Sequence, residues 1–316
     1  MRLKFLPVLK RCLVLSSLLM LGGCSSSGFW LLQPKGPIAG AELHYMILDV
    51  ALMAIVIVPT TFLLFFFLWR YRAPRGAKYR PGWSHSNVIE VVVWGIPVLI
   101  VGALSYFSWR GIHAVNPYHP GVVNTAHAAT GRNPLTVDVI TTDWQWMFVY
   151  PRQHIAVANE LVVPVGTKVK FRLTSTSVVN SFFIPQIVGQ IYAMPGMRTR
   201  QALVAQYPGV YHGFSAAFSG PGFSWMAFQV RAVTPSRFTR WVEHVSASQV
   251  TLDYAEFARF AKPTVNIGNR VRYFAHVRPG LFAKVVGAVR AQRLHYATPL
   301  SMTENMYSPI FREHSN

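Results

Sequence analysis

The sequence predicts a membrane α plus all-β protein: a two-helix transmembrane hairpin, then an extracytoplasmic β-sandwich and a helical C-terminal extension. Two long apolar stretches lie in the first third of the 316-residue chain. Beyond them apolar and polar residues alternate, as in half-buried strands. After about residue 233 the apolar residues recur at three- and four-residue intervals, as in helices. A hydrophobic content of 52% suits a membrane part joined to one soluble domain.

Residues 1–23 are predicted to be a lipoprotein signal peptide. Basic residues precede the short apolar core Leu13 to Leu21, which is the arrangement of an export signal. Leu21-Gly22-Gly23-Cys24 then resembles the lipobox of bacterial lipoproteins, in which the cysteine carries the lipid. A plain signal with a small-residue cleavage site is the alternative, but the small polar tether from Ser25 to Gly28 favours lipidation. We therefore expect residues 24–42 to be a segment anchored by acyl chains such as palmitate on Cys24.

The two apolar stretches, residues 43–69 and 88–109, are predicted to be transmembrane helices. Each is long enough to cross a bilayer, which takes about 20 residues. Asp49 interrupts the first span near its outer end, so it lies either near the headgroups or against a partner helix. Pro59 predicts a kink in the same helix.

The loop between the spans, residues 70–87, is predicted to be cytoplasmic. It is rich in cations, whereas only Lys35 precedes the first span after the signal. Cytoplasmic loops carry such an excess of positive charge. Everything after about residue 110 is therefore expected outside the cytoplasm, in agreement with the lipid anchor. The basic residues of this loop are Arg70, Arg72, Arg75, Lys78 and Arg80.

Residues 110–232 are predicted to be a linker and a Greek-key β-sandwich. The linker, Gly111 to Arg132, is rich in small and turn-forming residues. Lys168 to Leu173 alternates basic and apolar residues, and Trp225 to Val230 places three apolar side chains on one face. Short strands at such spacing, separated by Pro-Gly turns, favour a sandwich. Residues 233–316 are predicted to be a helical extension that covers the sandwich or a partner subunit, with helices at Phe238 to Val245, Thr251 to Phe260 and Leu281 to Leu294.

Charge and cysteine content exclude several classes of function. The net charge of +19 would suggest nucleic acid in a cytosolic protein, but export and two membrane spans argue against that partner. Both cysteines, Cys12 and Cys24, lie in the N-terminal targeting region. The rest of the chain can therefore form no disulfide, thiolate metal site or thiol nucleophile.

The stretch Gly213 to Met226 resembles the dinuclear-copper loop in subunit II of cytochrome c oxidases, which reads Cys-x-x-x-Cys-Gly-x-x-His-x-x-Met. Gly220 fixes the register. The family's second histidine opens a His-Ser-Phe-x-x-Pro stretch, and Asn180 to Pro185 matches it here. The residues at the family's copper-site positions are therefore Asn180, Ser215, Ala217, Ser219, Phe223 and Met226.

These residue types predict that the loop binds no metal. A copper pair needs thiolate and imidazole ligands. Ser215 and Ser219 offer only protonated hydroxyls, Phe223 has no lone pair, and the thioether of Met226 is a weak ligand. Ala217 matters less, because the family's glutamate at that position offers its backbone carbonyl. The sequence keeps the scaffold of the copper loop without its ligands.

This combination resembles subunit II of the cytochrome bo-type ubiquinol oxidases, over about Cys24 to Phe282. The resemblance implies a cupredoxin-like sandwich and a non-catalytic subunit of a proton-pumping oxidase in the bacterial inner membrane. In that family the haems, copper and ubiquinol belong to subunit I, which oxidises quinol and reduces dioxygen to water. The expected partners are subunit I, small membrane subunits (III and IV) and membrane lipids. Cytochrome c is not expected, because from Gly111 onward nineteen Lys and Arg outnumber eight Asp and Glu.

Two further sites are expected from the resemblance. Glu90 lies at the cytoplasmic end of the second span, where the family places a glutamate at the mouth of a proton pathway; a side chain that merely snorkels to the surface is the alternative. Asp143 to Trp146 matches an aromatic cluster, whose rings we expect to pack against subunit I or the membrane surface. His85, His154 and His212 are expected to be interface, surface or core residues rather than ligands.

Three alternatives remain from the sequence. A menaquinol oxidase subunit differs only in the donor, and nothing in this chain contacts the quinone ring. A membrane-anchored cupredoxin with mononuclear copper would need a His-Cys-His set, but no cysteine follows Cys24. A structural lipoprotein without an oxidase partner would not need two spans.

Overall fold

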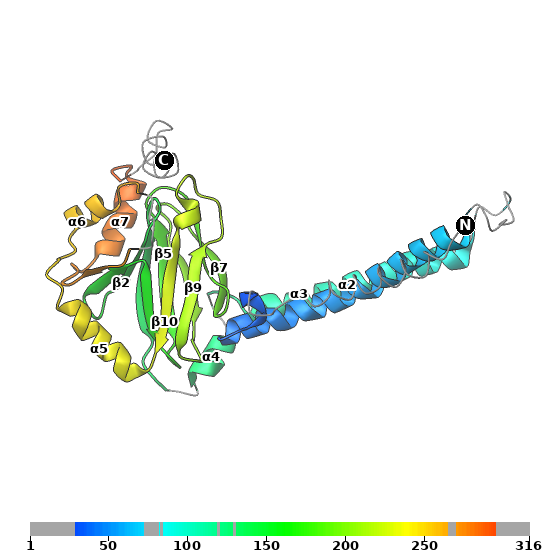
Figure 1. Cartoon of the computed structure of the whole chain (residues 1–316), viewed down its shortest axis with the longest axis horizontal. Coiled ribbons are helices and arrows are strands. Elements are labelled where there is room, and N and C mark those ends of the chain that lie inside the picture. Colours follow the sequence, from blue (N-terminus) through cyan, green and yellow to red (C-terminus); the bar gives the residue numbers. More distant parts are fainter. Residues whose placement is uncertain are drawn as a thin grey trace, which may run out of the picture.

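The computed structural model describes residues 29–72, 82, 85–118, 121–128, 131–264 and 270–294. A long helical hairpin projects from a β-sandwich domain, and the helices of the C-terminal extension lie on the side of the domain away from the hairpin (Figure 1). The signal segment, Cys24 and most of the basic loop lie outside the described residues. The predictions of lipidation and cleavage therefore stay predictions.

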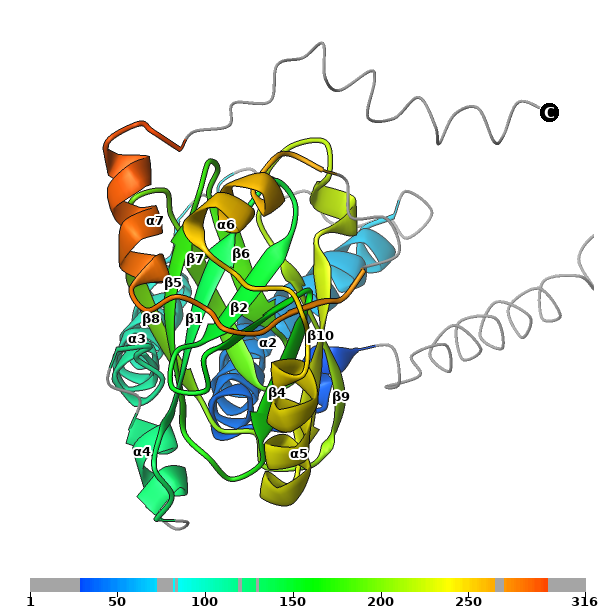
Figure 2. The same ribbon diagram turned by 90° about the vertical axis from the view of Figure 1, so that its left-hand side faces the viewer.

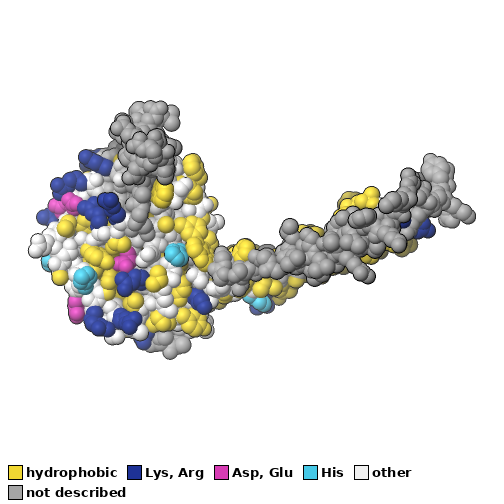
Figure 3. Space-filling view, viewed as in Figure 1, with side chains coloured by type: hydrophobic (Ala, Val, Ile, Leu, Met, Phe, Trp, Pro, Cys, Tyr) yellow, Lys and Arg dark blue, Asp and Glu magenta, His cyan; other side chains and the backbone are white. Residues whose placement is uncertain are grey.

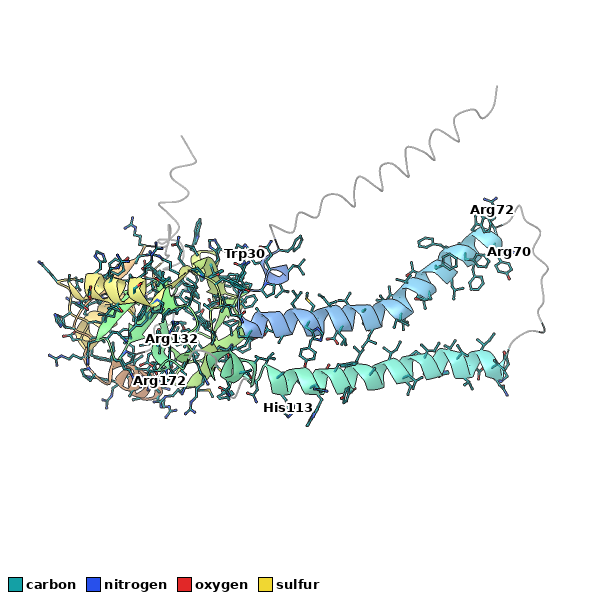
Figure 4. All side chains as sticks on the ribbon, turned by 90° about the horizontal axis from the view of Figure 1, so that it is seen from below. Trp30, Arg70, Arg72, His113, Arg132 and Arg172 are labelled. Atoms are coloured by element: carbon teal, nitrogen blue, oxygen red, sulfur yellow. The ribbon has the colours of Figure 1, made fainter. Side chains whose placement is uncertain are left out.

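The hairpin consists of α2 (Pro37–Arg70) and α3 (Asn87–Ala114), which pack along each other. Both helices are long and apolar enough to cross a membrane. Their outer ends extend beyond the predicted spans, and Ile38 and Ala39 of α2 are buried against the β-domain. Pro59 lies inside α2, and Figure 4 shows that this helix is bent, as the missing amide hydrogen bond predicts.

Two sheets form the sandwich, as predicted from the alternating pattern. The first has the strand order β11-β3-β2-β1-β5-β8, and the second has the order β4-β10-β9-β6-β7. The strands of the first sheet are β1 (Leu135–Thr141), β2 (Trp146–Tyr150), β3 (Ile155–Ala158), β5 (Val169–Ser175), β8 (Thr199–Leu203) and β11 (Arg272–Phe274). Those of the second are β4 (Glu160–Pro164), β6 (Asn180–Ile184), β7 (Val188–Ala193), β9 (Gly209–Ser215) and β10 (Ala227–Val233).

The core between the sheets is rich in aromatic rings. Phe182 and Phe228 stack with their centroids 5.5 Å apart and an interplanar angle of 7°. Trp146 and Phe148 lie against Phe228 at 4.9 and 5.1 Å. Met226, Phe228 and Val230 face this core, as the period of two predicts.

The C-terminal extension covers the sandwich of its own chain. Its helices are α5 (Pro235–Ser246), α6 (Tyr254–Phe260) and α7 (Leu281–Arg290), and α6 and α7 bury a second apolar cluster on the outer face of the first sheet. The sequence pattern missed β11, which pairs with β3 between α6 and α7. The apolar faces of α6 and α7 are therefore largely covered within this chain.

Contacts at the junction hold the hairpin against the domain. The predicted linker contains a helix, α4 (Gly121–Ala128), which packs against both α2 and α3. The segment that precedes α2 also contacts the β-domain. The amide of Lys35 donates to the carbonyl of Gln186. The short helix η2 (Trp30–Leu32) stacks the ring of Trp30 on that of His212, with the ring centroids 5.0 Å apart. On the face seen in Figure 3, hydrophobic side chains gather next to the hairpin, and Lys and Arg are more frequent away from it.

Candidate functional site

The loop between β9 and β10 lies beside the start of β6, so the structure brings the predicted copper-site positions together. Strand β6 pairs with β9 in the register Phe182 to Ser215, which places Asn180 two residues away along β6. The loop ends in the short helix η4 (Phe223–Trp225). The amide of Met226 then donates to the carbonyl of Phe223 at 3.0 Å, and the amide of Ser215 donates to the carbonyl of Met226 at 3.2 Å.

Hydrogen bonds of Ser215 stabilise the start of this loop. Its hydroxyl donates to the carbonyl of Ala217 at 3.2 Å and accepts from the amide of Ser181 at 3.2 Å. The hydroxyl therefore uses its one donor hydrogen, and accepts one hydrogen bond, within the protein backbone. A thiolate at this position could not donate the first of these bonds.

The ring of Trp144 lies beneath the second half of the loop. Its Nε1 donates to the carbonyl of Ser219 at 2.9 Å. Gly220 has φ +112°, which favours glycine, and a Cβ on Gly222 would lie 2.5 Å from the ring carbons of Trp144. The two glycines therefore let the backbone rest directly on the indole.

This burial corrects the prediction for the aromatic cluster. Trp144 is 1% exposed and Trp146 is 0% exposed, both within this chain alone. The indole of Trp146 donates to the carbonyl of Met226 at 3.3 Å. The expectation that these rings pack against subunit I or the membrane surface was wrong, because they fill the space between the loop and the sheets of their own domain.

The donor set at these positions does not fit a dinuclear copper centre. Asn180 uses its amide nitrogen to donate to Thr141 Oγ1 at 3.1 Å, and its carbonyl oxygen is a hard donor. Phe223 offers no ligand, and Met226 is buried in the core. Within the part of the chain that the structure describes, no three His, Cys, Asp or Glu side chains gather into a group that could hold a metal ion.

Glu90 lies at the end of the hairpin distant from the domain, where Figure 4 shows Arg70 and Arg72 at the end of α2. His85 Nδ1 is 2.7 Å from Glu90 Oε1, and the other ring nitrogen of His85 is 2.5 Å from Asn87 Oδ1. The Glu90 side chain is 53% exposed in this chain. The sequence predicts that His85 is an interface residue and gives no sign of its pairing with Glu90, because a spacing of five residues across a helix start produces no periodic signal.

Comparison with known proteins identifies the family. The model for "Cytochrome C oxidase subunit II, periplasmic domain" matches residues 135–233, and that for "COX Aromatic Rich Motif" matches residues 247–289. Ubiquinol oxidase subunit 2 of Acetobacter aceti is 42% identical over 287 residues, covering 90% of both chains. The chain belongs to the family of ubiquinol oxidase subunit 2.

Two further oxidase subunits are similar to this chain over most of their length. Cytochrome bo(3) ubiquinol oxidase subunit 2 of Pseudomonas putida is 40% identical over 270 residues, covering 85% of this chain and 82% of the relative. Quinol oxidase subunit 2 of Bacillus cereus is 34% identical over 255 residues, covering 80% and 85%. The resemblance inferred from the loop motif is confirmed, as is the sandwich fold.

Proposed function

We propose that this chain is the non-catalytic subunit II of a proton-pumping ubiquinol oxidase of the bacterial inner membrane. In such a complex, ubiquinol delivers electrons to subunit I, which reduces dioxygen to water. The observation that supports this most is the loop between β9 and β10, where the structure brings the copper-site positions together with residues that offer neither thiolate nor imidazole. Family membership supports the same function, because the similar chains are ubiquinol oxidase subunits.

We propose further that the chain binds no cofactor of its own. The haems, the copper and the ubiquinol belong to partner subunit I, and a lipid-soluble donor reaches that subunit through the bilayer. A copper relay in this chain is then dispensable. The excess of basic residues after Gly111 supports a complex that does not use the basic cytochrome c.

The distant end of the hairpin is proposed to be the site of proton uptake. Glu90 and His85 form a pair of titratable groups within 2.7 Å at the end that the cationic loop makes cytoplasmic. The half-exposed carboxyl of Glu90 is accessible to a partner subunit. In this proposal Glu90 takes up a proton from the cytoplasm and passes it to subunit I, and Cys24 anchors the opposite face of the assembly through its lipid.

Oxygen uptake by the assembled complex tests the proposal. The complex is purified through an affinity tag on this chain and supplied with ubiquinol, menaquinol or reduced cytochrome c. We expect ubiquinol to support oxygen reduction and cytochrome c to give none. Faster turnover with menaquinol would assign the chain to the second candidate, with which similarity to the quinol oxidase subunit 2 of Bacillus cereus is consistent. Turnover with cytochrome c alone would overturn both.

A further inference from the structure

Strands β5 and β8 present a row of cations on the outer face of the first sheet. Because side chains alternate along a strand, the buried positions of β5 face the core and the residues between them face outward. The same alternation on β8 turns Arg198, which precedes the strand, and Arg200 outward. A hollow of about 530 Å³ lies over these side chains. We call it the basic hollow, lined among others by Lys168, Lys170, Arg172, Arg198, Arg200 and Tyr118.

The positive charge of the basic hollow is only partly neutralised. Arg172 forms two hydrogen bonds with Asp138, at 2.5 and 2.6 Å, and Asp138 is itself buried. Arg172 is also paired directly across the strands with Arg200, an arrangement of like charges that destabilises a sheet. Among the described residues, Lys170, Arg198 and Arg200 form no ion pair with a carboxylate within 4.0 Å.

Lys168 is a partly buried lysine of the hollow, and burial is the main influence on its pKa. Lys168 donates a hydrogen bond to Asn124 Oδ1 of α4. Burial, and secondarily the charge of Lys170, lower the pKa of Lys168 below its ordinary value. An anion bound in the hollow would raise the pKa of Lys168, because it would stabilise the charged form of the lysine. The geometry and the charges therefore point to an anionic ligand.

With the hairpin placed in the membrane as proposed above, the hollow lies close to the outer surface of the bilayer, because Tyr118 and Asn124 line it. Tyr118 follows the end of α3 by four residues, and Asn124 lies on α4, which packs against both helices of the hairpin. The predicted span ends at Trp109, so the last five residues of α3 rise about 7.5 Å above it. That height is about the depth of the headgroup layer. Figure 2 shows β5 and β8 on the same side of the molecule as α3 and α4.

We propose that the basic hollow binds the phosphate of an anionic phospholipid headgroup in the outer leaflet. The guanidinium group of an arginine can donate two hydrogen bonds to the oxygens of one phosphate, and each lysine adds a positive charge on a flexible side chain. Tyr118 is half exposed beside them and suits the boundary between lipid and water. The inference rests on the membrane placement of the hairpin proposed above, and it adds a ligand site that the oxidase function does not require.

Lipid titration of the purified, delipidated complex tests the proposal. Short-chain phosphatidylglycerol, short-chain phosphatidylcholine and inorganic phosphate are added separately, and binding is followed by ³¹P NMR. The test variant is K170Q/R200Q, and the control is R237Q/R240Q on α5, which removes the same charge on the side of the domain away from the hairpin (Figure 1). Each basic residue near an anionic lipid contributes roughly fivefold in affinity, so the test variant should bind phosphatidylglycerol roughly 30-fold more weakly. The control should bind like the wild type.

Several outcomes would overturn the proposal. No saturable binding of phosphatidylglycerol, or equal losses in the two variants, would show that the hollow is not the site. Inorganic phosphate that saturates at the same concentration would assign the hollow to a free anion. Loss of a partner subunit from the K170Q/R200Q complex would assign it to an acidic protein surface. Ubiquinol oxidation is recorded on the same samples, so that failure of the oxidase function is distinguished from failure of lipid binding.

Discussion

Replacing Trp144 should destabilise the β-domain strongly, because the loop between β9 and β10 rests on its ring. Trp144→Ala removes a fully buried indole and leaves the carbonyl of Ser219 without its donor. Large-to-small changes of this kind cost about 3–5 kcal/mol. Gly222→Ala inserts a Cβ 2.5 Å from the same ring, and overpacking of this kind costs about 1–3 kcal/mol. In the Trp144→Ala background that clash is absent, so the second change should cost less than about 1 kcal/mol.

The double-mutant cycle is measured by urea unfolding of the full-length chain in detergent, followed by circular dichroism of the strands. The control is Gly287→Ala in α7, where an added Cβ meets nothing within 4 Å. Its effect should add to that of Trp144→Ala within about 0.5 kcal/mol. If the free-energy costs of Gly222→Ala and Trp144→Ala also add in the double variant, the claim that the indole fills the space beneath the loop is refuted.

Three further predictions concern the copper loop, the proton pathway and the anchor. Restoring the family ligands by N180H, S215C, A217E, S219C and F223H should give a purple dinuclear site after copper loading, since Gly220 and Met226 are in place; a folded but colourless protein would show that the backbone has diverged. Glu90→Ala should slow ubiquinol oxidation several-fold at normal haem content, with milder effects of Glu90→Asp and His85→Ala, and unchanged oxygen uptake would leave Glu90 a surface residue. Cys24→Ser should abolish fatty-acid labelling and leave the chain in the membrane fraction, because two spans suffice; release from that fraction would contradict the two-span account.

The parts of the fold that the sequence predicts are those with a local periodic signal. The two apolar stretches, the alternation on β5 and the helical spacing near α5 each lie within one segment. Strand β11 was missed because its three residues are too short for a pattern, and it is held by pairing with β3 more than a hundred residues earlier. Helix α4 was missed because its eight residues resemble linker composition and gain their partners only from the hairpin.

The sequence identifies which residues stand at the candidate site, but it does not predict the buried contacts around them. The loop motif identified the copper-site positions from Ser215 to Met226 by their spacing around Gly220, and the separate stretch Asn180 to Pro185 identified Asn180. Both are local properties of the chain. The burial of Trp144 depends on the absence of side chains at Gly220 and Gly222, more than seventy residues away. The pairing of His85 with Glu90 depends on how the chain enters α3. Contacts of this kind appear only once the elements are placed in space.

Copper binding by the unaltered chain tests the central claim most directly. The purified full-length protein is loaded with excess copper, desalted, and measured by metal analysis and visible spectroscopy. We predict far less than one copper per chain and no intense thiolate absorption, because Asn180, Ser215, Ser219 and Phe223 offer neither thiolate nor imidazole. Two tightly bound copper ions per chain, with the absorption of a thiolate-bridged pair, would contradict the account.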